Sequence, residues 1–370
     1  MSPTLGLRSW SPDTQIKKRV TLGLIIPGLG LTMVLLALCG YAAWNPLSRR
    51  YLDRVSFRLL IYTQVANLVY CVVWILGPGT LTADPGWQCG LLAFTTDTML
   101  MFSAGMFFCM AINLPLVLAH NVNGQKMEKY YVLGTTLLCL ICNIAPYASG
   151  HLGWDVIDDI CWYRITNTGD WLPWLIGTQI VWIMLFAVGE VAAFLIIVGY
   201  LVVYELETRR FLYDTDSQLK NNTRSSAASH RPASTIRMFR NIILRVGLYP
   251  LVSCLIHLST TVLILYLISH PELTKLNWRI DVTILALCAG RPLIYGLLAA
   301  TDPSFIRALH ALSHPEDESA MQSATQSRAL WRSAQYLSTV IDMPPDEADH
   351  EHDAEFKKDV RTSIDVVCQL

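Results

Sequence analysis

Charge is scarce in this 370-residue sequence, in which Asp, Glu, Lys and Arg together make up 15% of the residues. Soluble globular proteins contain about 25%. Long runs carry no charged residue at all, and 53% of the residues are hydrophobic. A water-soluble fold is therefore disfavoured. The net charge is only −1, so no overall positive field points to a nucleic-acid partner.

Histidine is nearly absent from the apolar runs, since His257 is the only one of nine histidines that lies in one. Membrane metallohydrolases bind their metal through clustered His and Asp side chains. We therefore expect no enzymatic activity, no metal site and no cofactor. The last apolar run has no lysine between Trp278 and Ala300, which excludes a retinal Schiff base there, as found in microbial rhodopsins.

Seven apolar runs approach or exceed the roughly 20 residues that a helix needs to cross about 30 Å of hydrocarbon. The runs are residues 20–44, 59–76, 89–119, 130–147, 171–204, 246–269 and 280–300. The first follows Lys17, Lys18 and Arg19, but at 25 residues it is too long for the apolar part of a signal peptide. The sequence predicts an all-α membrane protein with a seven-transmembrane helix bundle.

The distribution of basic residues predicts the orientation. The first, third and fifth connections hold 14 Lys or Arg, whereas the second, fourth and sixth hold 3. Because connections rich in Lys and Arg stay in the cytoplasm, we expect the N-terminus outside the cell and the C-terminus inside, in the plasma membrane. The basic residues before the first run favour the opposite orientation, but three separate connections outweigh them.

The predicted organisation has four parts. Residues 1–19 are an extracellular N-terminus, and residues 20–300 are the transmembrane domain. Residues 301–312 are expected to form an amphipathic helix on the membrane surface, with Asp302 as its cap and Pro303 at its first position. Residues 313–370 are expected to be a disordered, acidic cytoplasmic tail, since residues 301–370 carry 13 acidic and 6 basic residues.

Five acidic, basic or histidine residues fall inside the apolar runs, and one of them, Asp281, is at the start of the last run. The other four are candidates for ligand binding or for a polar core: Asp97, Glu190, His257 and Arg291. A charge in the bilayer is costly and usually faces the interior of the bundle. Two structural alternatives stay open. Arg291 can pair with Glu190, Asp97 or the amide of Asn67 in a purely structural role, and His257 can be an ordinary hydrogen-bonded core residue.

Two of the ten cysteines, Cys89 and Cys161, are predicted to face the oxidising side of the membrane. A disulfide between them is the expected result, with free thiols as the alternative. It would hold the loop at 148–170 over the third helix. The pair Cys139 and Cys142 is spaced as in metal sites, but it lies within a membrane run without a second pair, so we expect no metal there.

Three stretches are similar to fungal G-protein-coupled receptors of the cyclic-AMP-receptor-like type, which are related to the secretin receptors: Ser56-Phe57-Arg58-Leu59-Leu60-Ile61-Tyr62 with Asn67, residues 122–131, and Thr301-Asp302-Pro303-Ser304-Phe305. Cys161-Trp162 resembles a motif of the secretin and slime-mould cyclic-AMP receptors, and Pro250-Leu251-Val252-Ser253 resembles one of the secretin receptors. Arg291-Pro292-Leu293-Ile294-Tyr295 is similar to the Asn-Pro-x-x-Tyr motif of rhodopsin-like receptors. The resemblance covers about residues 20 to 312.

The resemblance implies a receptor that binds an extracellular ligand and activates a cytoplasmic heterotrimeric G protein. The outer halves of the third, fifth, sixth and seventh helices would hold the ligand, whose identity is not readable and for which cyclic AMP is not implied. Pro250, Pro292 and Tyr295 would form kink or switch positions, with a static kink as the alternative for Pro250. A seven-helix small-molecule transporter or channel is the second hypothesis for the whole chain.

The fifth connection, residues 205–245, carries eight Lys or Arg interleaved with Ser and Thr. Arg209, Arg210, Arg237 and Arg240 flank the fifth and sixth helices and are the predicted G-protein contacts. Binding of the same arginines to anionic lipid of the bilayer is the alternative. The hydroxyl-rich middle, residues 225–235, is expected to be disordered.

Overall fold

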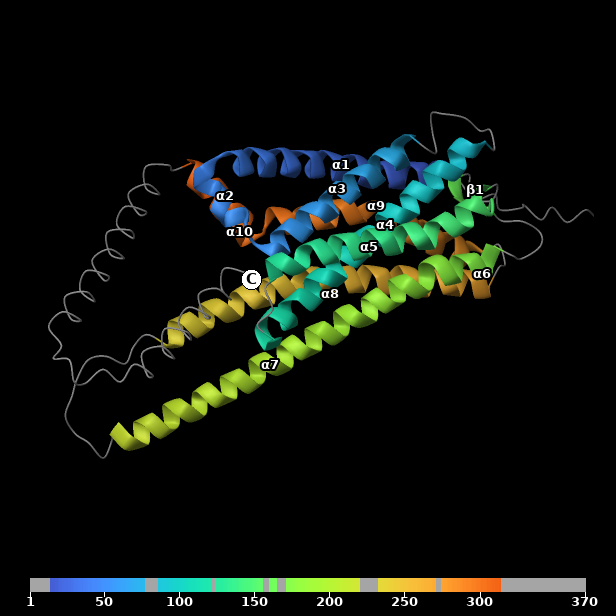
Figure 1. The fold of residues 1–370 in the computed structure, drawn as a ribbon. Helices are drawn as coiled ribbons and strands as arrows, with labels where there is room; N and C mark the ends of the chain where they lie inside the picture. The colour runs from blue at the N-terminus through green and yellow to red at the C-terminus, as the bar shows by residue number, and fades with distance from the viewer. Residues whose placement is uncertain are drawn as a thin grey trace, which may run out of the picture.

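The protein, seen here as a computed structural model, is described over residues 14–76, 86–120, 124–155, 160–164, 171–219, 232–270 and 274–313. Within these ranges the chain is an all-α bundle with one small hairpin (Figure 1). Seven helices are long and apolar enough to cross a membrane. The predicted fold class is confirmed. Most of the predicted tail, and residues 1–13, lie outside the described residues.

The bundle helices are α1 (Thr14–Trp44), α3 (Val55–Leu76), α4 (Trp87–His120), α5 (Gly124–Ala148), α7 (Val181–Leu219), α8 (Pro232–Ser269) and α9 (Lys275–Ala300). A short helix α6 (Trp171–Leu175) and a π-helical turn η1 (Ile176–Ile180) run directly into α7. The remaining elements are α2 (Pro46–Leu52), α10 (Pro303–Ser313), and the strands β1 (Leu152–Asp155) and β2 (Ile160–Tyr163).

Most helices are longer than the apolar runs that predicted them. The helix α1 begins at Thr14, so the last residues of the predicted N-terminal segment are helical. The largest difference is in the fifth connection, where α7 continues to Leu219 and α8 begins at Pro232. Hydropathy marks only the part of a helix that lies in hydrocarbon, whereas backbone hydrogen bonding continues into the polar residues at each end.

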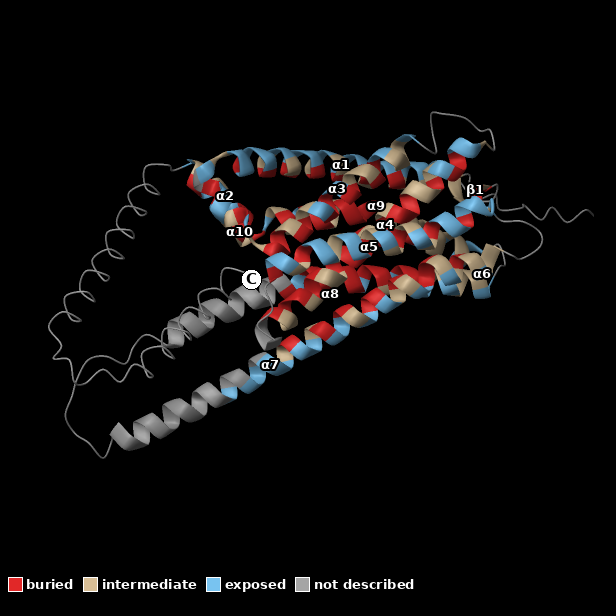
Figure 2. Ribbon diagram, viewed as in Figure 1, coloured by how far each residue is buried: buried red, intermediate tan, exposed pale blue. Residues whose placement is uncertain are grey.

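The helix α4 is the centre of the bundle. It packs against α3, α5, α7 and α8, and 72% of its apolar window is buried, compared with 22% for α1. Figure 2 shows the buried residues on the faces that meet within the bundle and the exposed ones on its outside. The helix α1 packs mainly on α9. Side chains of α4 therefore have the best access to the polar interior.

Glycine allows the close approach of α4 and α5. A Cβ added at Gly105 would overlap Thr135 Cγ2 of α5, a β-branched side chain that cannot turn away easily. A Cβ at Gly134, on the exposed side of α5, would meet nothing within 4 Å. We expect Gly105→Ala to lower the free energy of unfolding by about 1–3 kcal/mol, the usual effect of overpacking. Gly134→Ala is the control and should be neutral or slightly stabilising.

Thermal unfolding of the two variants in the same detergent measures the difference. Equal midpoints would show that the α4–α5 distance adjusts without cost.

The helix α10 confirms the predicted helix after the seventh span. Asp302 Oδ1 accepts the backbone N–H of Ser304 at 2.7 Å, which caps the first turn. Phe305 and Ala308 are buried, and the helix packs on α2 and on the end of α9. Its apolar face is thus directed at the bundle. Figure 1 places α2 and α10 at one end of the molecule, the α10 end, and β1 and α6 at the other, the hairpin end.

Candidate functional site

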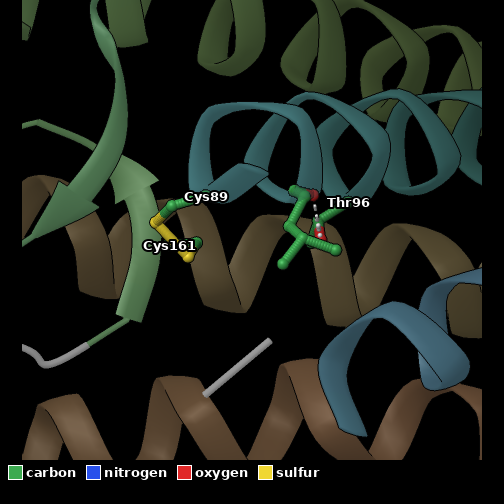
Figure 3. The surroundings of a disulfide bond; sticks show 4 residues. Cys89, Thr96 and Cys161 are labelled. Carbon is green, nitrogen blue, oxygen red and sulfur yellow. Dashed lines mark hydrogen bonds between the residues drawn. A yellow bond between two sulfur atoms is a disulfide. The ribbon is translucent and has the colours of Figure 1, made fainter. Parts of the chain in front are cut away.

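A disulfide joins Cys89, in the first turn of α4, to Cys161 in β2, with the two Cα atoms 5.2 Å apart (Figure 3). The strands β1 and β2 are antiparallel, with Trp154 opposite Cys161. Both strands contact α4, and a Cβ at Gly90 would lie 3.2 Å from the carbonyl oxygen of Leu152. The predicted disulfide is confirmed. It holds a hairpin, which the sequence did not predict, against the end of α4.

Tyr163 holds the second strand of the hairpin to the bundle. The side chain is fully buried, and its hydroxyl lies 2.7 Å from Thr178 Oγ1. Because the Thr178 hydroxyl donates to the carbonyl of Trp174 at 2.7 Å, the phenol donates to Thr178. Burial, with a smaller contribution from Asp97, raises the pKa of the Tyr163 phenol above its ordinary value. The phenol therefore stays neutral and keeps this hydrogen bond.

A cavity of about 190 Å³ lies beneath the hairpin. Its walls come from α3, α4, α6, α8, α9 and both strands, and they consist mainly of aromatic and aliphatic side chains. The lining residues are Tyr70, Trp74, Leu100, Asp155, Ile160, Trp162, Tyr163, Trp171, Leu175, Ile264, Leu267, Ile268, Asp281, Ile284, Leu285 and Cys288. We call this cavity the hairpin pocket. An ion pair between Lys17 of α1 and Asp281 of α9 lies beside it.

Asp97, the predicted floor of an outward pocket, is fully buried on α4. Its Oδ1 accepts a hydrogen bond from Gln179 Nε2 at 3.3 Å, and its Oδ2 has no partner among the described residues. Gln179 belongs to the π-helical turn η1, a distortion that is frequent at functional sites. Sequence reasoning missed Gln179, although it is a lone amide in an otherwise apolar run.

Arg291 lies buried on α9 and donates from Nη2 to Thr260 Oγ1 on α8 at 3.1 Å. Within the described residues it forms no ion pair with Asp97 or Glu190, and its Nε and Nη1 have no hydrogen-bond partner. Asn67 is engaged elsewhere, since its Oδ1 is 3.4 Å from Ser103 Oγ. The observed partner of Arg291 is therefore Thr260 and none of the three residues that the sequence suggested.

Glu190 of α7 accepts a hydrogen bond from Ser253 Oγ on α8 at 3.2 Å. Ser253 lies one turn beyond Pro250, which is inside α8. Tyr295, one turn beyond Arg291 on α9, is buried, with its ring 4.5 Å from that of Phe107 between centroids. Pro292 lies inside α9. Pro250 and Glu190 line the same small cavity, whereas Pro292 packs against Gly28 of α1.

His257 is 2% exposed, and neither ring nitrogen has a partner among the described residues. It lies on α8 one turn before Thr260, whose hydroxyl is 3.0 Å from the carbonyl oxygen of His257. His257 and Arg291 therefore belong to one neighbourhood. The four predicted ionisable residues do not form a single ion-pair network but occupy three places, at Gln179, at Ser253 and at Thr260.

A further contact of α8 lies at the α10 end. Tyr249 donates its hydroxyl hydrogen bond to Asp302 Oδ2 at 2.7 Å, the same carboxylate whose other oxygen caps α10. The carbonyl oxygen of Leu298 is 3.3 Å from the same hydroxyl. The Asp302 carboxylate thus joins α8 to α10, and the Tyr249 hydroxyl also contacts the end of α9. The sequence indicated Asp302 as a helix cap but contained no sign of its link to Tyr249.

Arg58 of α3 forms an ion pair with Asp53 and another with Glu128 of α5, the latter at 3.1 Å. The Tyr62 hydroxyl also lies 3.2 Å from Glu128. In the sequence, Arg58, Tyr62 and Glu128 stood out as parts of motifs and Arg58 also as a basic residue of the first connection, whereas Asp53 was not singled out. They join the beginnings of α3 and α5.

The four predicted G-protein contacts are helical in backbone. Arg209 and Arg210 belong to α7, and Arg237 and Arg240 belong to α8; their side chains lie outside the described part of the structure. Residues 225–235 were predicted to be disordered. Residues 232–235 instead form the beginning of α8, and residues 225–231 are not described.

No family model matches the chain, and none of the curated proteins matches it. The functional argument therefore rests on the geometry of the bundle.

Proposed function

We propose that this seven-helix membrane protein is a G-protein-coupled receptor, which binds a ligand in the hairpin pocket and activates a heterotrimeric G protein at the α10 end. The observation that supports the proposal most is the way α8 is held. It lines the hairpin pocket with Ile264, Leu267 and Ile268. Below the pocket, Thr260 contacts α9, Ser253 contacts α7, and Tyr249 contacts Asp302 between α9 and α10.

These contacts lie on one face of α8, because 249, 253 and 260 are spaced by one and two helical turns. Each is a single hydrogen bond to an ionisable side chain, and such bonds stabilise by about 1.5–3 kcal/mol. Pro250 has no backbone N–H and removes one hydrogen bond within α8 itself. Moving the half of α8 near the α10 end therefore breaks few interactions.

The pocket and the contacts give a physical route from ligand to G protein. A ligand changes the equilibrium between two arrangements of the bundle only if it binds one of them better. Three of the residues that line the pocket belong to α8. A ligand that prefers a shifted α8 would therefore also favour loss of the Ser253 and Tyr249 contacts. The resulting opening beside α7 and α10 would admit the G protein.

In this proposal the hairpin end is extracellular and the α10 end is cytoplasmic, in the plasma membrane. The basic connections support that orientation. So does the disulfide at the hairpin end, because disulfides form in oxidising compartments. Arg209, Arg210, Arg237 and Arg240 would then meet the G protein, with anionic lipid of the inner leaflet as the alternative partner.

The second candidate is a small-molecule transporter or channel, which seven apolar helices also suit. Two assays on the same reconstituted protein separate the two. A receptor accelerates nucleotide exchange on an added G protein and carries no solute. A transporter moves solute across liposomes that contain no G protein, and that result would replace our proposal.

The Tyr249 contact predicts a gain of basal activity. Tyr249→Phe keeps the ring but removes the hydroxyl that donates a hydrogen bond to Asp302 Oδ2. If the resting arrangement loses about 1.5 kcal/mol relative to the open one, the population of the open arrangement rises about tenfold. Basal nucleotide exchange should rise by up to that factor. The control is Tyr130→Phe, since Tyr130 is 69% exposed on α5; equal exchange by both variants would show that the contact does not hold α8.

A further inference from the structure

We infer that the hairpin pocket binds a small aromatic or aliphatic molecule without negative charge, about the size of one ring with a short substituent. The inference rests on the proposed function for its purpose, since it specifies the ligand of the proposed receptor. It is independent of that function in its evidence, which consists of the volume and the lining of the pocket.

The volume limits the size of the ligand. The pocket measures about 190 Å³, and an engineered apolar cavity of about 150 Å³ holds one benzene molecule. A ring with two or three further heavy atoms therefore fits. Larger ligands would have to displace the hairpin, which the Cys89–Cys161 bond and the Tyr163 hydrogen bond hold in place.

The lining decides the polarity of the ligand. Five lining residues are aromatic and nine are Ile, Leu or Cys. Aromatic faces carry partial negative charge, which attracts cations and disfavours anions, and their large apolar area favours contact with apolar groups. An apolar molecule gains most from such walls.

The two charged side chains that line the pocket are both acidic, and the basic residue beside it, Lys17, is paired with one of them. Asp155 and Asp281 are the charged residues among the described lining, and no Lys, Arg or His is among them. Asp281 is paired with Lys17, and Asp155 is buried within the hairpin. A carboxylate or phosphate placed here would lose its hydration without gaining a basic partner. A nucleotide such as cyclic AMP is therefore a poor fit in both charge and size.

Three matched probes test the inference: 2-phenylethanol, 2-phenylethylamine and phenylacetate. They share one ring and differ in charge, being neutral, cationic and anionic at neutral pH. The full-length protein in nanodiscs is titrated with each probe, and binding is measured directly by ligand-observed NMR without any G protein. Empty nanodiscs give the contribution of lipid partitioning, which is subtracted.

The first two probes should bind, and phenylacetate should bind at least tenfold more weakly. Ile264→Phe fills part of the pocket and should remove the binding. Its control is Val262→Phe on the same helix, where Val262 is 61% exposed; this variant should bind as the parent does. Equal or tighter binding of phenylacetate overturns the inference, as does the absence of binding by all three probes or unchanged binding by Ile264→Phe. Because binding is measured without any G protein, its outcome is separate from that of the proposed function, which nucleotide exchange by the parent protein tests.

Discussion

The protein in which Cys89 and Cys161 are both replaced by Ala is expected to lose the hairpin from its place on α4 and, with it, binding in the hairpin pocket. The bond closes a loop of 72 residues, for which the chain-entropy relation gives about 4 kcal/mol. The unfolded state of a membrane protein retains its inserted helices, so its loops are already restricted. We therefore expect a smaller loss, about 2 kcal/mol in the free energy of unfolding.

The control for this variant is Cys39→Ala combined with Cys142→Ala, two cysteines that form no disulfide. Thermal unfolding under non-reducing conditions and binding of 2-phenylethanol measure the two effects. The disulfide variant should lose both stability and binding, whereas the control should keep its binding. If the disulfide variant binds the probe as the parent does, the hairpin is positioned without the bond and the pocket does not depend on it.

Arg291→Gln is expected to reduce ligand-stimulated nucleotide exchange at least tenfold while the protein stays folded. Arg291 is a buried cation with one hydrogen bond, to Thr260, and with unpartnered Nε and Nη1. Such a group is costly in a closed bundle. An opened bundle that admits water would reduce that cost. Removing the charge therefore removes part of the preference for the open arrangement, and the equilibrium shifts toward the resting one.

Stability separates this effect from misfolding. Replacing a poorly paired buried charge by a neutral residue is often neutral or stabilising by about 1–4 kcal/mol, so Arg291→Gln should not lower the unfolding temperature. Arg279→Gln, at an exposed position on the same helix α9, is the control. Dose–response curves at matched surface expression provide the measurement. Raised basal exchange in Arg291→Gln would contradict the assigned direction, and an unchanged response would return Arg291 to a packing role.

The seven spans could be predicted from the sequence because the bilayer imposes one requirement on all of them. Each span must satisfy its own backbone hydrogen bonds over about 30 Å, which a helix does. Such a helix is recognised in the sequence as a long, mostly apolar run. The disulfide was predictable for a similar reason, since compartment alone separated Cys89 and Cys161 from the other cysteines. The ends of the helices could not be predicted in this way, because a helix continues into polar residues that hydropathy does not mark.

The contacts within the polar core could not be predicted from the sequence. Arg291, Asp97 and Glu190 stood out as charges within apolar runs, but which neutral group each one meets depends on how the helices are rotated and shifted against each other. The partners Thr260, Gln179 and Ser253 are small or neutral, so hydropathy gave them no special weight. The hairpin was missed because its strands have four residues each, too few for a periodic signal without the α4 surface beneath them.

Nucleotide exchange on a purified fungal heterotrimeric G protein tests the central claim most directly. The parent protein, Tyr249→Phe and Tyr130→Phe are placed in nanodiscs at equal concentration, and uptake of a non-hydrolysable GTP analogue is followed against empty nanodiscs. Our account predicts uptake above the empty-nanodisc rate with the parent and a further rise, up to about tenfold, with Tyr249→Phe alone. Uptake at the empty-nanodisc rate with the folded parent and with both folded variants would contradict the claim that this protein is a G-protein-coupled receptor.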